Sequence, residues 1–378
     1  MFSILALCCS VNAGCSEHEF PYGFALIQKE DPSPSVVRGF MTTGNSPQKD
    51  YDDARSWGAN VIRLQMHPVT YAMGVNQKFW DAWPSYIDRL EEQVKRAKQA
   101  GLKVVVDLHE PPFQNLESKR SDFWHQFQYP EFWNRSDLAE GFCRAWTEIA
   151  TRLLPYRETI WGYDLYNEPV DRSSKGDAPP AQWRPLAIEI INAIRRVDKK
   201  VWIIYEPGQW GAFSGFKGLE PLPDAKVIYS AHFYQPHQFT HQGVNNVQGT
   251  PLDEAMKQIN IRYPSTINGV EWDKKHFNEI LKAADEFQAK WKVPIYVGEF
   301  SVIRWAPKDA AIRWLRDVVD LFESRGWSWT YHAFREFHGW SLEHDEKFWM
   351  KGMPRPEPVN YETDRARIIK EAFEKNWK

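Results

Sequence analysis

The chain has 378 residues, which is enough for one large α/β domain or two medium ones and for a sizeable core. Its 47 basic and 50 acidic residues nearly balance, and a net charge of −3 gives no indication of a nucleic-acid partner or of an anionic membrane. Aromatic residues make up 15% of the chain, with 19 Trp, so we expect some aromatic rings to be exposed in clefts.

The N-terminal segment 2–13 is short and apolar, and the residues that end at Ala13 resemble a signal-peptidase site. We therefore expect residues 1–15 to be an export leader, which places the protein outside the cell, in a periplasm or at the cell surface. No positive residue precedes the apolar core, so a cytosolic N-terminus is the alternative. Residues 12–15 also partly match a lipoprotein site, which would put a lipid anchor on Cys15. No other apolar run is long enough to predict a membrane span.

Strand-like and helix-like segments alternate along the rest of the chain. Apolar runs predict strands at 35–41, 59–66, 102–109, 159–166, 200–205, 226–234, 294–298 and 326–332. Amphipathic patterns predict helices at 48–57, 83–100, 137–154, 183–197, 277–291, 308–325 and 365–373. Between the strand at 226–234 and the helix at 277–291 lies a long polar segment, 235–273, which we expect to be a cleft loop with a small helix.

These eight strands are mostly apolar on both faces and are separated by helices, which is typical of parallel strands buried on both sides. Eight such units predict a single α/β domain, a (β/α)₈ TIM barrel, over residues 16–378. A doubly wound open sheet is the alternative, but no glycine-rich phosphate loop follows an early strand. No Pro-, Gly- or Ser-rich linker divides the chain.

Polar residues follow the predicted strands in unusual number. Glu168 follows one apolar strand within Tyr166-Asn167-Glu168-Pro169, and Glu299 follows another. The other strand-end candidates are Arg63, His109, Glu110, Asn167, Glu206, His232, Tyr234 and His332. Any one of them has a structural interpretation, as a buried core partner or a solvated side chain. Because burying such groups unpaired costs several kcal/mol each, the whole set favours an active site at the C-terminal ends of the strands.

Glycoside hydrolysis requires two carboxyl groups that face each other across the bond to be cleaved. One, as an acid, protonates the leaving oxygen, and the other, as a carboxylate, attacks the sugar or activates water. The acid needs a raised pKa, and a nearby Arg or Tyr hydroxyl keeps the other group ionised. The chain has no Cys/His cluster with zinc spacing, and two carboxyl groups suffice, so we expect no metal and no organic cofactor.

The sequence resembles glycoside hydrolase family 5, a family of retaining (β/α)₈ glycosidases. The motifs that carry the resemblance are, in chain order, Ile62-Arg63-Leu64, Asp107-Leu108-His109, Tyr166-Asn167-Glu168-Pro169, His232-Phe233-Tyr234 and Gly298-Glu299-Phe300. The resemblance covers nearly the whole chain, from Arg38 to His332 and beyond. Asn-Glu-Pro alone is a common tripeptide, whereas the ordered set is specific.

The resemblance implies roles for these residues. Glu168 would be the general acid/base and Glu299 the nucleophile, about 5–5.5 Å apart as in retaining enzymes. Asn167 would hydrogen-bond the sugar 2-hydroxyl, while Arg63 and Tyr234 would hold Glu299 ionised. His109 and His232 would line the subsite where the bond breaks, with His232 close to Glu168.

One position departs from the family pattern. The family usually carries a Trp on the eighth strand as a floor for the reacting sugar, and this chain has His332 there. Trp210 or Trp340 would then be an alternative aromatic platform. Glu206, Glu336 and Glu343 are further acidic groups near predicted loops, for which a solvated surface position is favoured over sugar binding. Among them Glu206 is the strongest sugar-binding candidate, because it directly ends a strand.

The sequence thus predicts a monomeric retaining glycoside hydrolase that cleaves β-glycosidic bonds in an oligo- or polysaccharide. An endo-β-1,4-glucanase-like activity is our first choice, and a β-mannanase or an exo-acting enzyme of the same clan is the alternative. A non-catalytic carbohydrate-binding barrel fits the aromatic excess but not the pair of glutamates with Arg63. A lyase or aldolase ranks last, since no Lys stands in a Schiff-base position.

Overall fold

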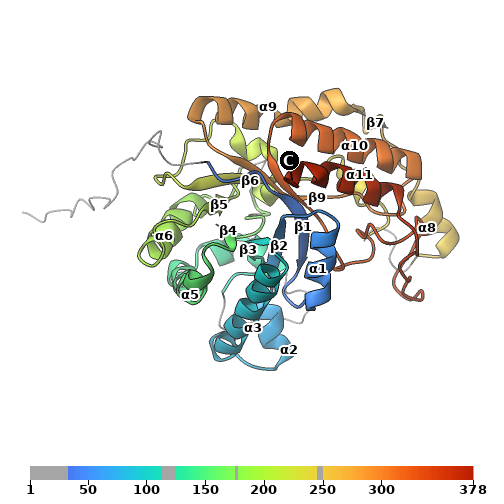
Figure 1. Ribbon diagram of the computed structural model, residues 1–378. Helices are drawn as coiled ribbons and strands as arrows, with labels where there is room; N and C mark the ends of the chain where they lie inside the picture. The colour runs from blue at the N-terminus through green and yellow to red at the C-terminus, as the bar shows by residue number, and fades with distance from the viewer. Residues whose placement is uncertain (1–32, 113–124, 175–177, 245–249, 378) are drawn as a thin grey trace, which may run out of the picture.

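The computed structural model of the protein describes residues 33–112, 125–174, 178–244 and 250–377, so the expected leader at 1–15 lies outside the described residues. Within them, parallel strands close into a barrel in the order β1-β10-β9-β6-β5-β4-β3-β2 (Figure 1). The barrel strands are β1 (Arg38–Thr43), β2 (Val61–Met66), β3 (Lys103–Leu108), β4 (Ile160–Asp164), β5 (Ile203–Tyr205), β6 (Val227–Phe233), β9 (Ile295–Phe300) and β10 (Ser328–Tyr331). The predicted single barrel is confirmed.

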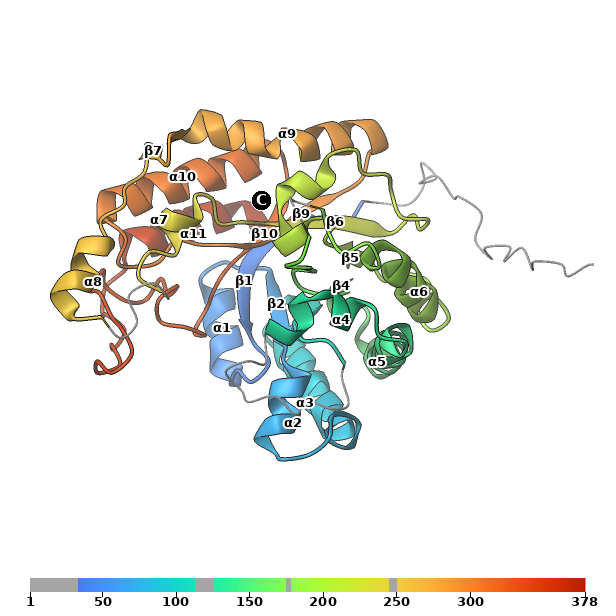
Figure 2. The same cartoon turned by 180° about the vertical axis from the view of Figure 1, so that it is seen from behind.

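Helices surround the strands on all sides (Figures 1 and 2). They are α1 (Gln48–Ser56), α2 (Pro68–Gly74), α3 (Phe79–Gln99), α4 (Pro130–Trp133), α5 (Leu138–Leu153), α6 (Trp183–Arg195), α7 (His237–Thr240), α8 (Leu252–Gln258), α9 (Lys274–Trp291), α10 (Lys308–Ser324) and α11 (Asp364–Phe373). Short 3₁₀ turns lie at His125–Gln128, Leu154–Tyr156, Gln209–Gly211, Phe213–Phe216 and Glu374–Trp377. Each predicted helix is present, with its ends displaced by a few residues.

The polar segment 235–273 contains more structure than the single small helix that we expected. In its described part it forms α7, α8 and an antiparallel hairpin of β7 (Ser265–Ile267) and β8 (Val270–Trp272). Helix α8 lies at the edge of the molecule in both views (Figures 1 and 2). Helices α2 and α4 were not predicted either, because both are short.

The barrel interior is apolar near the N-terminal ends of the strands. Its buried side chains contact one another there: Val37, Val61, Val105, Trp161, Ile204, Ile228 and Tyr296. Because side chains alternate along a strand, the residues two positions further along point into the same interior. On β2 and β3 these are Arg63 and Asp107, and both are fully buried. The interior therefore changes from apolar to ionic toward the C-terminal ends, where barrel enzymes place their sites.

The other face of each strand packs on the surrounding helices. On β2 the alternate residues Ile62, Leu64 and Met66 belong to the large buried cluster that also contains the apolar faces of the helices. This arrangement explains why the strands read as apolar on both faces. None of the helices in the described part of the chain is both long and apolar enough to cross a membrane.

Candidate active site

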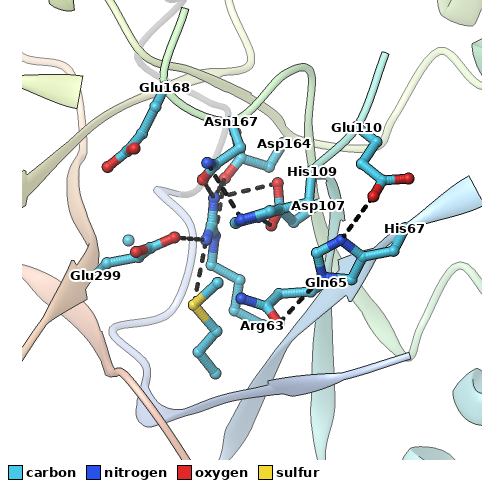
Figure 3. Close-up of polar contacts among 12 residues, drawn as sticks. Arg63, Gln65, His67, Asp107, His109, Glu110, Asp164, Asn167, Glu168 and Glu299 are labelled. Atoms are coloured by element: carbon cyan, nitrogen blue, oxygen red, sulfur yellow. Dashed lines mark hydrogen bonds and ion pairs between the residues drawn. The ribbon is translucent and has the colours of Figure 1, made fainter. Parts of the chain in front are cut away.

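Arg63 is the centre of the polar cluster at the C-terminal end of the barrel (Figure 3). Its Nη1 donates to Glu299 Oε1 at 2.6 Å, which joins β2 to β9. Its Nε and Nη2 donate to Asp164 Oδ2 at 3.1 and 2.9 Å, and Nη2 lies 3.2 Å from Asp107 Oδ1. The guanidinium is thus fixed by carboxylates from three strands, and Glu299 is fixed by it.

Glu299 is held from its other side by Tyr234, the residue after β6. The Tyr234 hydroxyl donates to Glu299 Oε2 at 2.8 Å. The side chain of Glu299 keeps 6% of its surface exposed, so its carboxylate is oriented by both partners and is still reachable from solvent. Tyr234 also lies 2.6 Å from His332 Nδ1, which brings the residue after β10 into the same group.

Glu168 lies in the loop after β4, and its backbone has a left-handed φ of 47°. A non-glycine residue adopts this conformation at a cost in energy, and such residues cluster at functional sites. Two contacts hold it: its N–H donates to Glu206 Oε2 at 3.0 Å, and His232 Nδ1 lies 2.8 Å from its Oε1. Its side chain is 25% exposed, so Glu168 has more access to solvent than Glu299.

A local irregularity brings His232 to this position. The pairing of β6 with β9 shifts register between Ala231 and His232, so that His232 lies opposite Glu299. Such bulges re-aim side chains next to active sites. The neighbouring Gly298 is required because a Cβ there would lie 2.8 Å from His232 Nε2.

Glu168 and Glu299 come from opposite parts of the sequence and face the same space on one side of Arg63 (Figure 3). A carboxylate oxygen of each, together with a ring nitrogen of His232, lie within 4.8 Å of one another. Inverting glycosidases need about 6.5–9.5 Å between the two groups, to admit a water, and retaining ones need about 5–5.5 Å. The two nearest oxygens are thus closer than the gap that an inverting enzyme needs for its water, which favours the retaining arrangement.

The comparisons with known proteins agree with this geometry. The model of the cellulase family, glycosyl hydrolase family 5, matches residues 28–337. The chain belongs to glycosyl hydrolase family 5. It is therefore a glycoside hydrolase, and the double-displacement retaining mechanism is general to the family. The resemblance inferred from the ordered motifs is confirmed.

Relatives and solved structures support the same assignment. Endoglucanase C of Acetivibrio thermocellus is 27% identical over 309 residues, which cover 75% of this chain and 83% of that protein. Cellodextrinase A of Ruminococcus flavefaciens is 26% identical over 310 residues, covering 78% and 84%. The crystal structure of endoglucanase Cel5A from Thermotoga maritima superposes with a TM-score of 0.64 at 26% identity, covering 89% of this chain and 96% of that one.

In this family 5 chain the two glutamates have opposite electrostatic environments. Burial raises the pKa of Glu168, and the nearby Glu299 and Glu206 carboxylates raise it further, against the hydrogen bond from His232. Burial alone would also raise the pKa of Glu299, but the cations His232 and Arg63 outweigh it and hold that pKa well below its usual range. The Glu168 carboxyl group therefore holds its proton to a higher pH than an ordinary glutamate, and the Glu299 carboxyl group loses its proton at a lower pH.

His109 and Asn167 complete the group around Arg63. The Arg63 Nη2 donates to Asn167 Oδ1 at 2.9 Å, which fixes the amide orientation and leaves Nδ2 as a donor. His109 Nδ1 lies 2.8 Å from Asp107 Oδ2. Burial disfavours the charged imidazole, but Asp107 outweighs it and raises the pKa of His109 to about 9.

The structure corrects the interpretation of Glu206. Its side chain has no exposed surface, so it neither lies on a solvated surface nor contacts a sugar. Its oxygens instead contact the backbone N–H of Glu168, Arg63 Nη2 at 3.4 Å and His232 Nε2 at 3.1 Å. Gly211 allows this packing, because a Cβ there would lie 2.9 Å from Glu206 Oε2. Glu206 acts beneath the site, through the groups that it holds.

The two candidate aromatic platforms differ in exposure. Trp210 is 39% exposed, and its backbone N–H donates to the carbonyl of Pro169 at 3.3 Å, so its backbone lies next to the Glu168 loop. Trp340 is only 6% exposed and packs behind His332, with 5.9 Å between ring centroids. Of these two rings, Trp210 is the one available to a ligand.

Three acidic residues of the cluster were missed or misassigned from the sequence. Asp107 and Asp164 are fully buried partners of Arg63, and Glu336 bonds His332 Nε2 at 2.7 Å instead of facing bulk solvent. Asp107 carried a signal, because it lies two residues before His109 on one strand face. Glu343, by contrast, contacts none of these residues and forms an ion pair with Arg335, with 2.7 Å between Oε1 and Nη2.

Glu168, His232 and Glu299 are also the group of described residues whose spacing would admit a metal ion. Their atoms already have partners, since Arg63 and Tyr234 occupy the oxygens of Glu299 and His232 bonds Glu168. A cation would have to displace the Arg63 guanidinium at 2.6 Å. We therefore assign no metal to these residues.

Proposed function

We propose that the protein is an endo-acting β-1,4-glucanase in which Glu299 is the nucleophile and Glu168 the general acid/base. The observation that carries the proposal is the pair of carboxyl groups with oxygens within 4.8 Å of each other and with pKa values shifted in opposite directions. The names of the relatives at 26–27% identity support a glucan as the substrate.

In the first step Glu299, ionised beside Arg63 and Tyr234, attacks the anomeric carbon and forms a glycosyl ester. The glycosidic bond breaks, and Glu168 transfers its proton to the leaving oxygen. The raised pKa of Glu168 supports this role, because the group must still hold its proton near neutral pH.

In the second step Glu168, now ionised, takes a proton from water as the water attacks the same carbon. The ester bond to Glu299 breaks, and its electron pair returns to the carboxylate. His232, 2.8 Å from Glu168 Oε1, keeps the group aimed at the same point in both steps. Arg63 occupies Asn167 Oδ1, and Asn167 Nδ2 lies 3.4 Å from His109 Nε2. An amide nitrogen carries two N–H donors, and we assign the second one to a sugar hydroxyl beside the reacting carbon.

The two glutamates by themselves do not select the sugar or the linkage. A β-mannanase or an exo-acting glycosidase of the same clan would use the same two glutamates. Trp210, exposed next to the Glu168 loop, supports the binding of a further sugar beside the reacting one, as a chain-cleaving enzyme needs. A non-catalytic carbohydrate-binding barrel is disfavoured because Arg63 and Tyr234 hold Glu299 ready for chemistry.

Export and a monomeric state are part of the same proposal. Export depends on the apolar segment 2–13, and a lipid anchor at Cys15 is its variant form. A polysaccharide supplied from outside is too large to cross a cell membrane, so export would bring the enzyme to such a substrate. The full-length protein is expressed, and the culture medium and the membrane fraction are probed by Western blotting. Soluble export predicts the protein in the medium, and a lipid anchor predicts it in the membrane fraction.

The proposed function is tested by hydrolysis of an aryl β-cellobioside by the wild type and by Glu299→Gln. We expect at least about a thousandfold loss of kcat in the variant, since the covalent intermediate cannot form. Glu343→Gln, with the same change in charge at a residue paired with Arg335, is the matched control and should keep its rate. Equal rates in wild type and Glu299→Gln would exclude the mechanism.

Substrate choice requires a second measurement. Purified protein is incubated with cellulose, mixed-linkage glucan, mannan and xylan, and the product lengths are followed over time. Endo-glucanase action predicts a mixture of oligosaccharides from the two glucans from the start. A single short product would favour an exo-acting enzyme, and preferred cleavage of mannan would favour the β-mannanase.

A further inference from the structure

Four side chains form a continuous contact chain that ends at Glu299. Glu336 Oε2 lies 2.7 Å from His332 Nε2, and His332 Nδ1 lies 2.6 Å from the Tyr234 hydroxyl. The Tyr234 hydroxyl in turn donates to Glu299 Oε2 at 2.8 Å. His332 is also in direct ion-pair range of Glu299, with Nδ1 3.6 Å from Oε2. The chain thus connects the loop after β10 with the proposed nucleophile on β9.

Counting protons along this chain defines the state of His332. Tyr234 has one O–H, and an ionised Glu299 only accepts, so the proton of Tyr234 points to Glu299. The Tyr234 oxygen must then accept from His332, which requires a proton on Nδ1. The contact of Nε2 with Glu336 needs a second proton between those two atoms, on one or the other.

The location of that second proton follows from the surrounding charges. If Nε2 carries it, His332 is an imidazolium between the carboxylates of Glu336 and Glu299. If Glu336 carries it, His332 is neutral, and its ion pairs with Glu299, at 3.6 Å, and with Glu336 are both lost. The side chains of His332 and Glu336 are only 14% and 25% exposed, so solvent screens these contacts little.

The other groups packed against His332 do not reverse this balance. His109, on the β3 side, has a pKa raised to about 9, and its positive form opposes the charge on His332, but it is one cation against two anions. His241, next to Tyr234, stays neutral, because burial and the neighbouring His237 and His332 lower its pKa to about 3. Trp340 presents an uncharged ring behind His332. Burial lowers the pKa of His332, but Glu336 and Glu299 outweigh it and raise that pKa above its usual value.

We propose that His332 is a positioning residue, held as an imidazolium by Glu336, that keeps Glu299 ionised and oriented through Tyr234. The position where the family pattern predicts an aromatic floor carries a charged group in this chain instead. The consequence is a catalytic activity that extends to lower pH than the same site would reach with a neutral residue there. The kinetic part of this inference rests on the proposed role of Glu299.

The substitution Glu336→Gln removes the charge and keeps the shape of the side chain. With the anion gone, His332 loses its proton more easily, and Glu299 loses a nearby cation. We expect the acid limb of kcat/KM against pH on an aryl β-glycoside to move up by about one pH unit, since an opposite charge at this range shifts a carboxyl pKa by about 1–3 units. Glu343→Gln is the matched control, an acid of the same loop bonded to Arg335 instead.

A second measurement is independent of activity. In ¹⁵N-labelled protein, both ring nitrogens of His332 should give the imidazolium signature at about pH 6, with His332→Gln used to assign the signals. In Glu336→Gln the same ring should become neutral at a lower pH than in the wild type. The ¹⁵N spectra also report directly on any variant that folds but has no activity.

Two results would overturn the proposal: a neutral His332 ring in the wild type at about pH 6, or an acid limb that moves no further in Glu336→Gln than in Glu343→Gln. A wild type that hydrolyses no glycoside at all would refute the proposed function instead, and the ring signature would still decide the state of His332.

Discussion

The backbone N–H of Glu168 donates to Oε2 of Glu206 at 3.0 Å, so a fully buried acid that follows β5 holds the left-handed backbone of Glu168 in the loop after β4. The same Glu206 side chain lies 3.1 Å from His232 Nε2. The orientation of Glu168 therefore depends on a buried residue that has no surface with which to contact the substrate. Removal of the Glu206 carboxylate should lower the stability of the protein by a measurable amount.

Glu206→Ala should lower the free energy of unfolding by about 3–5 kcal/mol, because it leaves Arg63 and His232 with one buried counter-charge fewer. Urea unfolding followed by tryptophan fluorescence measures this change. Glu371→Ala, which removes an exposed partner of Arg316, is the control and should stay within about 1 kcal/mol of the wild type. A Glu206→Ala variant as stable as that control would contradict the supporting role.

Glu168→Ala should lose activity in a way that depends on the leaving group. A dinitrophenyl β-glycoside needs no acid to depart, so its first step should stay fast, whereas an unsubstituted oligosaccharide should lose about a hundredfold or more. Azide, as a nucleophile that needs no base, should then rescue turnover and give a glycosyl azide of retained β configuration. An α-azide would instead identify Glu168 as the nucleophile and reverse the two roles.

The pH dependence of kcat/KM should be bell-shaped. The pKa of Glu299 is lowered, so activity is lost only as the pH falls through that low value and the carboxylate is protonated. The pKa of Glu168 is raised, so activity is lost as the pH rises through a value above the usual carboxyl range. The alkaline limb should disappear in Glu168→Ala assayed on the dinitrophenyl substrate. A limb that persists there belongs to another group.

Trp210→Ala should weaken substrate binding with little effect on the chemical step for activated substrates. The ring is 39% exposed beside the Glu168 loop, and loss of such a stacking surface should raise KM for oligosaccharides by about tenfold. Trp377 is a matched control, since it is 51% exposed but bonds the carbonyl of Gly58, before the start of β2 at the other end of the barrel. If both variants raise KM alike, the effect is not a sugar contact.

The sequence was sufficient to predict the barrel and the two glutamates, because both depend on local patterns. A buried strand reads as an apolar run. Glu168 lies in the loop four residues after the end of β4, and Glu299 is the next-to-last residue of β9, one position inside the strand that we expected it to follow. The hairpin of β7 and β8 was missed although a local signal existed. Asn268 and Gly269 both have positive φ, 50° and 79°, and Asn-Gly is the strongest short turn signal for a hairpin.

The network beneath the glutamates could not be predicted in the same way. Arg63 bonds Asp164, which is 101 positions away along the chain, and nothing local distinguishes a buried Asp from an exposed one. For the same reason Glu336 was expected on the solvated surface, and Glu206 was expected either there or in contact with the sugar. Their roles depend on the closure of the barrel and on the loop after β10, which only three-dimensional contacts define.

The most direct test of the central claim is covalent trapping with an activated 2-deoxy-2-fluoro-β-cellobioside, followed by mass spectrometry of the peptides. The fluorine slows both steps, and a good leaving group allows the first to complete, so the glycosyl ester accumulates. We predict a single fluorocellobiosyl adduct on Glu299, slow reactivation on addition of an acceptor sugar, and no adduct in Glu299→Gln. An adduct on Glu168, or rapid turnover of a natural oligosaccharide with inversion at the anomeric carbon, would contradict the account.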